Sequence, residues 1–287
     1  RDKDWQLLPI QVSHCDDFVS MKDQPTPALL KRINTSIVQA LESVAKKKNA
    51  AFVSAGNSGA VLMAAIFISG KVSGIKRAAF GNFLPTKNGS IFFIDLGANA
   101  ACRPEFLLDF ARMGSAYVCL EKNNKKPKIA LLSNGHEPYK GCAVVKQAYK
   151  LLEESKLNFV GNVEPDQILL GDKCDVVVSD GFAGNILLKT AQATAKTMSG
   201  WLAQEHNSSI FKRLAYILNI PVYKGLRKRM QQRSKGGALL LGVNDPVVIA
   251  HGNSDASVIK NAILFAYEKV QNKFLDRFNE KVAKVIY

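Results

Sequence analysis

The chain has 287 residues, of which 47% are hydrophobic and 22% are charged, as in an ordinary globular protein with a sizeable core. This composition excludes a disordered chain, a collagen-like chain and a small disulfide scaffold. Its 39 lysines and arginines outnumber 24 acidic residues, and the formal net charge of +15 predicts an anionic partner. Nucleic acid, an anionic membrane, an acidic protein and a phosphorylated substrate all fit that charge.

Short apolar runs alternate with longer helical patterns along most of the chain. This alternation predicts an α/β fold with a mostly parallel sheet that helices cover on both faces. The expected strands are 8–12, 51–54, 79–84, 91–96, 128–133, 158–160, 175–179 and 247–251. The expected helices are 27–48, 58–69, 104–119, 139–152, 184–204 and 254–286. No repeat or flexible linker divides the pattern, so we expect a single domain over 1–287.

The cysteines and the longest apolar stretch indicate the cellular location of the protein. Its five cysteines form no CxxC pair and no cluster with histidine at zinc spacing, so neither a structural metal nor a disulfide framework is expected. The longest apolar stretch, residues 60–69, is far shorter than the ~20 residues that cross a bilayer. We therefore expect a cytoplasmic protein that is soluble or lies on a membrane surface.

Glycine and asparagine are concentrated in the turns that follow five of the expected strands. These turns are 54–60, 95–99, 134–141, 161–164 and 180–185. Because ligands of open parallel sheets bind at the carboxyl ends of the strands, we expect the turns to share one edge and to bind phosphate through backbone N–H groups and amide side chains. Taken singly, each asparagine could equally be a turn or cap residue. No turn matches a P-loop or GxGxxG motif, so no nucleotide cofactor is expected.

Residues 210–235 form a basic and apolar window without any acidic residue. Eight of the fifteen net positive charges lie there, beside apolar residues at helical spacing. The pattern predicts a basic amphipathic helical insertion over 206–237, which either lies on an anionic membrane or packs on a dimer partner. The candidate contact residues are Phe211, Arg213, Leu214, Ile217, Leu218, Arg227, Lys228 and Arg229.

The order and spacing of several motifs resemble the bacterial phosphate acyltransferases of phospholipid synthesis, the PlsX family. The resembling segments are SAGNSGA at 54–60, LPTKNG at 84–89, DLGAN at 95–99, VGNVE at 160–164, DGFAGNILLK at 180–189 and HGNSD at 251–255. The resemblance implies a Rossmann-like α/β/α fold, similar to phosphotransacetylase and isocitrate-dehydrogenase-type folds, and a homodimer.

The resemblance also implies a reaction. Acyl-[acyl carrier protein] and inorganic phosphate would give acyl phosphate and free carrier protein, and the product would feed a membrane acyltransferase that acylates glycerol 3-phosphate. The acidic carrier is then a further candidate partner of the basic window. No cofactor is implied.

Three features of the sequence depart from the family pattern. The N-terminal strand of the family, with its DAMGGD-type turn, is not found, so the expected acyltransferase domain lacks that strand. His136-Glu137-Pro138 stands where the family has three acidic residues, and Ala101 stands where an aspartate usually follows the DLGAN motif.

The implied reaction needs groups that position the phosphate and stabilise negative charge. Phosphate is already an anionic nucleophile at pH 7, so it needs a cation to hold it and a donor for the thioester oxygen as that oxygen becomes negative. We expect Lys140 to be the cation and Asn185 the donor. Further candidates for binding substrate or phosphate are Asn57, Ser58, Gly59, Lys87, Asn99, Asn162, Asp180, Gly181, Gly184 and His251. A covalent cysteine mechanism is disfavoured, because neither Cys102 nor Cys142 has a histidine partner in the sequence.

Two other functions compete with this interpretation. A phosphotransacetylase-like enzyme acting on acyl-CoA would keep the fold and change the acyl donor. A basic nucleic-acid-binding protein is the least favoured function, because the basic window is interleaved with aliphatic rather than aromatic residues and no nucleic-acid-binding signature is present.

Overall fold

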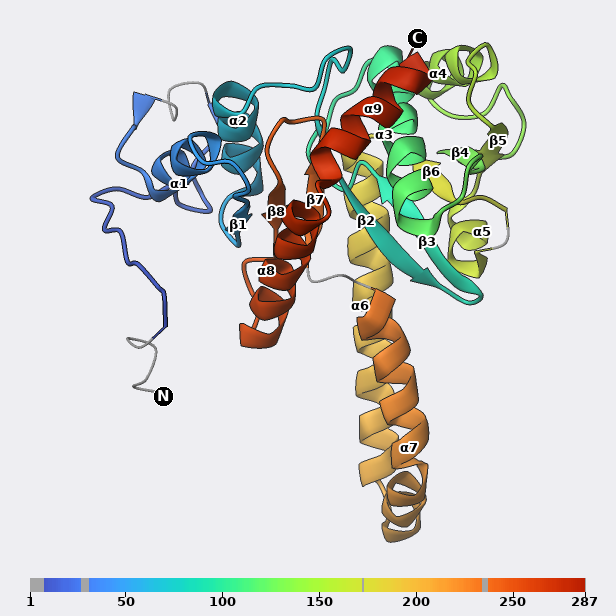
Figure 1. The fold of residues 1–287 in the computed structure, drawn as a ribbon. Helices are drawn as coiled ribbons and strands as arrows, with labels where there is room; N and C mark the ends of the chain where they lie inside the picture. The colour runs from blue at the N-terminus through green and yellow to red at the C-terminus, as the bar shows by residue number, and fades with distance from the viewer. Residues whose placement is uncertain (1–7, 27–30, 172, 234–236, 287) are drawn as a thin grey trace.

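The computed structural model describes residues 8–26, 31–171, 173–233 and 237–286, and for residues 207, 210, 213–215 and 226–233 it describes the helical backbone alone. Eight strands form one sheet in the order β1-β8-β7-β2-β3-β6-β4-β5 (Figure 1). The strands are β1 Phe52–Ser54, β2 Ala79–Thr86, β3 Gly89–Ile94, β4 Ile129–Leu132, β5 Phe159–Val163, β6 Val176–Val178, β7 Ala238–Leu241 and β8 Val247–Ile249. The helices are α1 Ser36–Ala45, α2 Ser58–Ile68, α3 Pro104–Lys122, α4 Ala143–Glu153, α5 Pro165–Leu170, α6 Gly181–Asn207, α7 Ile210–Arg233, α8 Ala256–Gln271 and α9 Phe274–Ile286.

The sheet carries helices on both faces, which confirms the predicted α/β class. Successive residues of a strand point to opposite faces, so Phe92 and Ile94 of β3 belong to the apolar cluster that includes α3 and α9, while Ile91 and Phe93 belong to the cluster on the other face, which includes α1 and α2. All four side chains are buried. Strands covered on both sides need continuous apolar sequence, and this is why β3 and β6 were recognisable as short apolar runs.

The strands do not all run in one direction. β1 is parallel to β8, and β3, β6, β4 and β5 form a parallel group in that order. β7 is antiparallel to both its neighbours, β8 and β2, and β2 is also antiparallel to β3. The carboxyl ends of β3, β6, β4 and β5 therefore lie at one edge of the sheet, which we call the Asp95 edge. The carboxyl ends of β1 and β8 lie at the other, the Ser54 edge. The expectation that all five turns share one edge is wrong, because the β2–β3 hairpin reverses the chain between the first turn and the other four.

Several predicted elements differ from the observed ones. Residues 8–12 alternate apolar and polar side chains but form no strand, and Leu8, Ile10 and Val12 are exposed. The alternation predicts a strand only if a neighbouring strand supplies hydrogen bonds, and none of the described strands pairs with this segment. Helix α1 begins at Ser36 rather than at 27, and residues 27–30 of that prediction lie outside the described residues.

The carboxyl-terminal half also holds elements that the pattern did not predict. Strand β7 and helix α5 were not expected, since each is a short run that periodicity cannot distinguish from a loop. The single helix expected over 254–286 is divided into α8 and α9, where Lys273 adopts a φ of 47° in the left-handed region.

Helices α6 and α7 form a hairpin that extends away from the sheet (Figure 1). The 27 residues of α6 span about 40 Å at 1.5 Å per residue, so only the first turns of this helix contact the sheet. The predicted insertion over 206–237 corresponds in position to the end of α6 and to α7. Within the described parts of the chain, no helix has both the length and the apolar character of a transmembrane span.

Candidate functional site

Four of the glycine- and asparagine-rich turns meet at the Asp95 edge. They follow β3, β6, β4 and β5, which are consecutive neighbours in the sheet. Neighbouring strands lie about 4.8 Å apart, so the turns after β3 and β4 are separated by about 10 Å. A small anion and the group that reacts with it can therefore contact several of these turns at once.

Asp95 holds the first of these turns together. Its side chain is fully buried, and its Oδ1 accepts hydrogen bonds from the N–H groups of Phe80, Gly97 and Ala98 at 3.1, 3.1 and 3.0 Å. Its Oδ2 accepts from the backbone N–H and the side-chain amide of Asn99 at 2.8 and 2.9 Å. Burial raises the pKa of Asp95, while these hydrogen bonds oppose the shift. The carboxylate therefore organises the turn and has no remaining place for a ligand.

Asn99 is engaged within the fold in the same way. It is 3% exposed, and its Nδ2 also donates to the carbonyl oxygen of Ala78 at 2.9 Å. Its Oδ1 accepts from Nε of Arg77 at 2.7 Å. Both ends of the amide thus have protein partners, so Asn99 orients its neighbours and does not offer a free donor.

The start of α6 packs directly on this turn. Asp180 caps the helix by accepting from the N–H of Ala183 at 2.7 Å. The N–H of Gly181 donates to the carbonyl oxygen of Asn99 at 2.8 Å, and that of Gly184 donates to Asp180 at 3.0 Å. A Cβ atom on Gly181 would lie 2.7 Å from the Asn99 nitrogen, and one on Gly184 only 1.9 Å from the carbonyl oxygen of Asp95. The two glycines permit close packing, and their N–H groups are already bonded.

Asn185 has a different position from these residues. It is half-buried on the first turns of α6, where Gly97 approaches its side chain: a Cβ on Gly97 would lie 3.5 Å from the Cβ of Asn185. The amide of Asn185 forms no hydrogen bond with the described residues of the chain. It therefore keeps two N–H donors for a ligand at this edge.

Lys140 lies on the turn after β4. Internal hydrogen bonds fix the loop around it, from its own N–H to the carbonyl oxygen of Glu137 at 3.0 Å and from the N–H of Gly141 to Oδ1 of Asn134 at 2.9 Å. Gly141 has a φ of 92°, which favours glycine. The Lys140 ammonium lies 5.8 Å from the ring centroid of Tyr139 and forms no hydrogen bond or ion pair with the described residues.

Two buried polar side chains lie below this loop. Ser133 follows β4, is 8% exposed, and its Oγ has no hydrogen-bond partner in the described structure. Asn162, at 7% exposed, donates to the carbonyl oxygen of Glu137 at 2.9 Å, but its Oδ1 has no partner there. Buried polar atoms without a partner are costly, so a ligand or an ordered water would be stabilised here.

The remaining predicted residues lie elsewhere. Asn57, Ser58, Gly59 and His251 follow β1 and β8 at the Ser54 edge, and Lys87 lies in the hairpin between β2 and β3, also away from the Asp95 edge. The structure does not bring these five residues together with Lys140 and Asn185.

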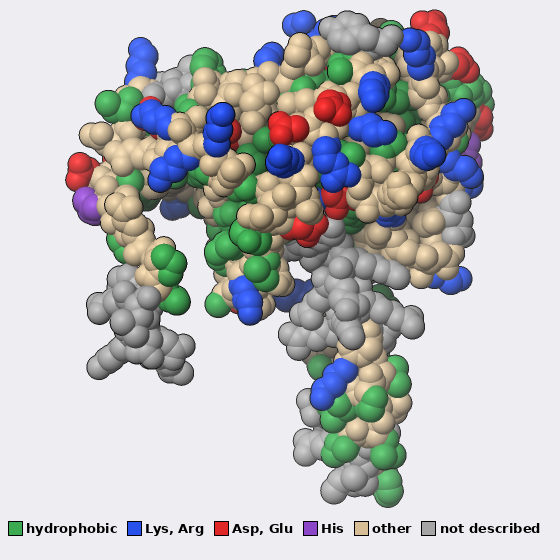
Figure 2. All heavy atoms as spheres, in the orientation of Figure 1, with side chains coloured by type: hydrophobic (Ala, Val, Ile, Leu, Met, Phe, Trp, Pro, Cys, Tyr) green, Lys and Arg blue, Asp and Glu red, His purple; other side chains and the backbone are tan. Residues whose placement is uncertain are grey.

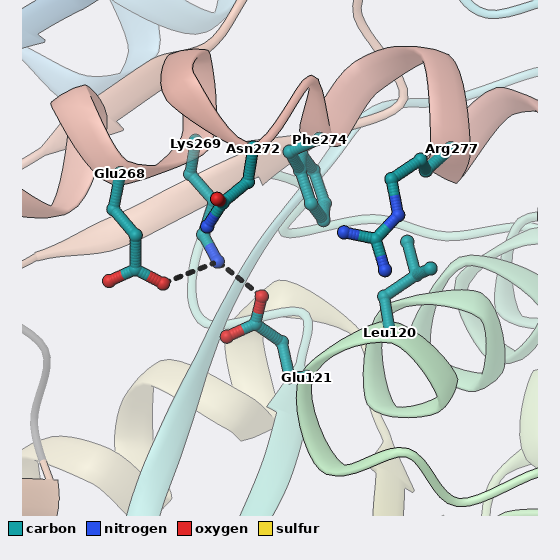
Figure 3. Close-up of a pocket in the computed structure, with 7 residues that line it drawn as sticks. All are labelled: Leu120, Glu121, Glu268, Lys269, Asn272, Phe274 and Arg277. Carbon is teal, nitrogen blue, oxygen red and sulfur yellow. Dashed lines mark hydrogen bonds and ion pairs between the residues drawn. The ribbon is translucent and has the colours of Figure 1, made fainter.

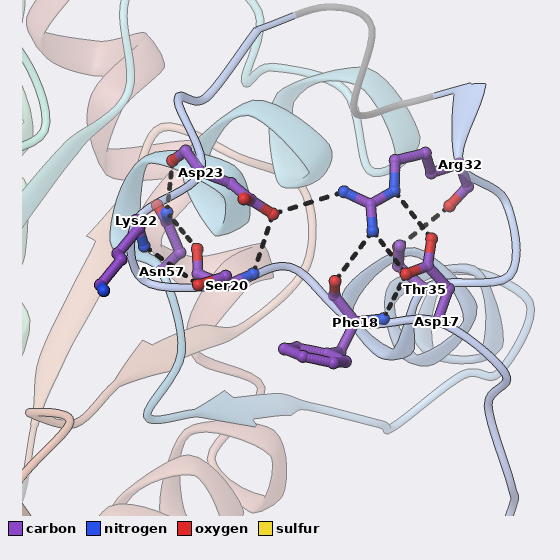
Figure 4. Close-up of polar contacts among 8 residues, drawn as sticks. All are labelled: Asp17, Phe18, Ser20, Lys22, Asp23, Arg32, Thr35 and Asn57. Atoms are coloured by element: carbon purple, nitrogen blue, oxygen red, sulfur yellow. Dashed lines mark hydrogen bonds and ion pairs between the residues drawn. The ribbon is translucent and has the colours of Figure 1, made fainter.

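Figure 4 shows what Asn57 does instead. Its amide donates to the carbonyl oxygens of Ser20 and Asp23 at 3.1 and 2.9 Å, and its Oδ1 caps α2 by accepting from the N–H of Ala60 at 3.1 Å. Arg32 ties the same segment together through ion pairs with Asp17 and Asp23. The asparagine in the first turn is therefore a structural cap that anchors the N-terminal segment.

The cysteines near the site are poor nucleophiles or lack a base. Burial, together with the carboxylates of Asp95 and Asp180, raises the pKa of Cys102 to about 12, so its thiol stays protonated at neutral pH. Cys142 is exposed at the start of α4. His136 faces Gln167, with 2.7 Å between Nε2 and Nε2, and Glu164, at 3.5 Å from Oε1. It forms no hydrogen bond with a cysteine within the described chain.

Arg77 and Ser133 belong to the edge and were not among the predicted site residues. Arg77 precedes β2, and an amino end of a strand reaches this edge only because β2 is antiparallel to β3. That pairing is a tertiary fact, and no local pattern near Arg77 indicates it. Ser133 is the last residue of the predicted strand 128–133, directly before the turn 134–141, so a rule that included the final residue of each strand could have found it.

A cavity of about 190 Å³ lies at the other end of α3, far from this edge (Figure 3). It is lined by Leu120, Glu121, Glu268, Lys269, Asn272, Phe274 and Arg277. Lys269 is 2% exposed and forms ion pairs with Glu121 and Glu268. Its charge is already compensated within the fold, so the hollow does not mark the functional site.

Known proteins resemble the chain over most of its length. A family model described as "Fatty acid synthesis protein" matches residues 4–277. The phosphate acyltransferase of Thermodesulfovibrio yellowstonii is 42% identical over 273 residues, which are 95% of this chain and 79% of that protein. That of Geobacillus thermodenitrificans is 41% identical and matches 92% of this chain and 80% of its own length. These similarities confirm the resemblance found in the motifs.

Solved structures support the fold. The EutD phosphotransacetylase from Staphylococcus aureus superposes with a TM-score of 0.52 over 83% of this chain and 68% of its own, at 20% identity. A branched-chain phosphotransacylase from Enterococcus faecalis gives a TM-score of 0.50 over 82% of this chain and 78% of its own, at 16% identity. At such identities the likeness concerns the fold alone.

Proposed function

The chain belongs to the fatty acid synthesis protein family that contains these phosphate acyltransferases, and from this premise we propose its reaction. It transfers a long-chain acyl group from acyl carrier protein to inorganic phosphate, and it releases acyl phosphate and free carrier protein for phospholipid synthesis. The observation that carries the proposal is the pair of uncommitted polar groups at the Asp95 edge, the Lys140 ammonium and the Asn185 amide.

The proposed mechanism uses these two groups in turn. Lys140 holds the phosphate anion, and one phosphate oxygen attacks the thioester carbon and forms a C–O bond. The carbonyl oxygen becomes negative and receives a hydrogen bond from Asn185. The C–S bond then breaks with its electron pair, and the carrier thiolate takes up the proton of the phosphate. No enzyme nucleophile is needed, in keeping with the raised pKa of Cys102.

The reaction is tested directly by trapping its product. Palmitoyl carrier protein, inorganic phosphate and the protein are mixed, and hydroxylamine converts any acyl phosphate to acyl hydroxamate. We expect hydroxamate only when phosphate is present. Palmitoyl-CoA in place of the carrier tests the phosphotransacetylase-like alternative. Folded protein that forms no phosphate-dependent hydroxamate from either donor contradicts the proposal.

We further propose that the α6–α7 hairpin lies on an anionic membrane. At the membrane surface, the protein releases acyl phosphate close to a membrane glycerol-3-phosphate acyltransferase. Phe211 and Leu218 are each 81% exposed, and Ile217 is 58% exposed, so the hairpin carries apolar side chains that the described fold does not cover (Figure 2). Such side chains beside lysine and arginine favour the surface of an anionic membrane. The predicted contacts Arg213, Leu214, Arg227, Lys228 and Arg229 have side chains outside the described residues.

Vesicle flotation separates this role from its alternatives. We expect binding to vesicles that contain phosphatidylglycerol, weaker binding to phosphatidylcholine alone, and loss of binding in the Phe211→Glu, Leu218→Glu double variant. The same substitution at an exposed apolar position on another helix, Phe67→Glu on α2, is the control. Equal binding to both vesicles, or none, contradicts the membrane role and leaves acyl carrier protein or a dimer partner to contact the hairpin.

We also propose a homodimer, as the family resemblance implies. Helix α8 supports it with exposed apolar side chains at Ile263, Leu264 and Tyr267, which are 53%, 53% and 61% exposed. Sedimentation at micromolar concentration is expected to give a dimer mass for the wild type and a monomer mass for Ile263→Asp. A monomeric wild type contradicts this part of the proposal.

A further inference from the structure

Arg77 is a second cation at the Asp95 edge. Its side chain is exposed, its Nε donates to Oδ1 of Asn99 at 2.7 Å, and its guanidinium carbon lies 5.9 Å from the ring centroid of Phe106. Its two Nη groups form no hydrogen bond or ion pair with the described residues. The guanidinium is therefore anchored by one nitrogen and one ring, and its other donors are open.

The anchor of Arg77 is itself rigid. Asn99 is 3% exposed and is held by Asp95 and by the carbonyl oxygen of Ala78. A series of hydrogen bonds thus leads from the buried carboxylate through the buried amide to the exposed guanidinium. A cation that is oriented in advance loses less side-chain entropy when it binds an anion, and a planar guanidinium can bind a phosphate with two parallel hydrogen bonds.

Two other arginines of the described chain show a contrast. Arg112 pairs with the buried Asp109 at 3.2 Å, and Arg32 pairs with Asp17 and Asp23. Each of these guanidinium groups has a carboxylate partner from the protein. Arg77 has none, although it is bonded through Asn99 to the turn 95–99, against which the candidate donor Asn185 of α6 packs at Gly97.

We infer that Arg77 is a second anion-binding residue of this site, which Asn99 positions and which receives a phosphate oxyanion of a substrate. The inference rests on the proposed function and extends it from one cation to two. In a reaction between phosphate and a carrier-bound thioester, two substrate groups carry a phosphate oxyanion. One is the inorganic phosphate that attacks, and the other is the phosphodiester of the phosphopantetheine arm that carries the thioester.

The test compares Arg77→Gln with Lys76→Gln in the full chain. Both variants remove one positive charge at adjacent exposed positions, but Lys76 contacts Asp109, through a hydrogen bond from its backbone N–H to Oδ2 at 2.8 Å. The hydroxamate assay gives kcat and the KM values for phosphate and for palmitoyl carrier protein. The melting temperature reports the fold, and its rise on adding inorganic phosphate or free 4′-phosphopantetheine reports binding without turnover.

We expect Arg77→Gln to raise one of the two KM values at least tenfold, with kcat and the melting temperature nearly unchanged, and Lys76→Gln to change both KM values less than twofold. A raised KM for phosphate assigns Arg77 to inorganic phosphate, and a raised KM for the carrier assigns it to the phosphopantetheine arm. Arg77→Lys, which keeps the charge but not the planar fork, is expected to fall between wild type and Arg77→Gln.

Other outcomes overturn the inference. Unchanged KM values in Arg77→Gln exclude an anion-binding role. A lowered melting temperature in both Arg77 variants, with reduced kcat and unchanged KM values, shows that Arg77 only holds the turn in place. If the wild type makes no hydroxamate, the proposed function fails separately, and the ligand-dependent rise in melting temperature decides about Arg77: it is expected in wild type and Lys76→Gln and absent in Arg77→Gln. A rise of equal size in all three proteins, or no rise in wild type with either probe, overturns the inference.

Discussion

Cations lie against aromatic rings in two regions of this molecule, and the two regions use them in opposite ways. In the cavity at the end of α3, Lys269 is 2% exposed, lies 4.8 to 5.4 Å from three ring centroids, and is paired with Glu121 and Glu268. At the Asp95 edge, Lys140 and Arg77 each lie near one ring and form no ion pair with the described residues.

The difference follows from the cost of removing a charge from water. A buried ammonium is tolerated only when carboxylates and ring faces replace its hydration, so the fold itself occupies the positions that a ligand would need. A partly exposed cation keeps its hydration and can exchange water for an anion. We therefore do not expect the cavity at the end of α3 to bind the substrate.

The largest effect is expected from Lys269→Met. The change removes the cation that pairs with the mostly buried carboxylate of Glu121 and should destabilise the fold by about 3–5 kcal/mol, measured by urea unfolding. Lys260→Met, at an exposed lysine on the same helix, is the control and should change stability by less than about 0.5 kcal/mol. Adding Glu121→Gln to Lys269→Met should restore part of the loss. A loss below about 1 kcal/mol would mean that the buried pair does not hold α8 on α3.

Lys140→Ala should show the opposite pattern. Losing the cation that holds phosphate should lower kcat/KM by about a hundredfold or more, while the free energy of unfolding changes by less than about 0.5 kcal/mol. Lys146→Ala, an exposed lysine on α4, is the matched control and should stay near wild-type activity. Wild-type turnover in Lys140→Ala would remove this residue from the mechanism.

Alanine substitutions at two glycines of α6 test the packing on which the site depends. Gly184→Ala places a Cβ 1.9 Å from the carbonyl oxygen of Asp95 and should cost about 1–3 kcal/mol of stability and reduce activity, because Asn185 moves with the helix. Gly200→Ala lies on the same helix with open space around it and should stabilise the protein by about 0.5–1 kcal/mol. Equal effects at the two positions would contradict the close packing of the first turn.

The smallest expected effect is a difference in the rate of thiol labelling between a buried and an exposed cysteine. Burial raises the pKa of Cys174 to about 12, so roughly one thiol in ten thousand is ionised at pH 8. Cys142 is exposed. Iodoacetamide at pH 8 should label Cys142 well before Cys174, as mass spectrometry of peptides can show. Similar rates for the two would mean that the fold does not protect Cys174.

Local sequence patterns were sufficient to predict those strands and helices whose signal lies in their own residues. Strands β3 and β6 are continuous apolar runs, and the helix predicted from residue 58 begins there as α2, directly after its cap Asn57. Helix α6 begins at Gly181, three residues before the predicted start, because Asp180 caps it. The segment 8–12 shows the limit. Its alternation is that of a strand, but a strand also needs a partner, and pairing is a property of the sheet and not of the segment.

The sequence by itself determined the family, the α/β class and the turns that carry polar residues, because motif order and apolar periodicity are written along the chain. Only the tertiary structure decided which of those residues share an edge and which keep free donors. Strand direction separates His251 from Lys140, although both follow a strand. Likewise, Asn99 and Asn185 both lie in predicted turns, but the amide of Asn99 is bonded to Asp95, Ala78 and Arg77, whereas that of Asn185 is not bonded to the described residues. A hydrogen bond occupies both its partners, so a side chain is available to a ligand only where the fold has left it unbonded.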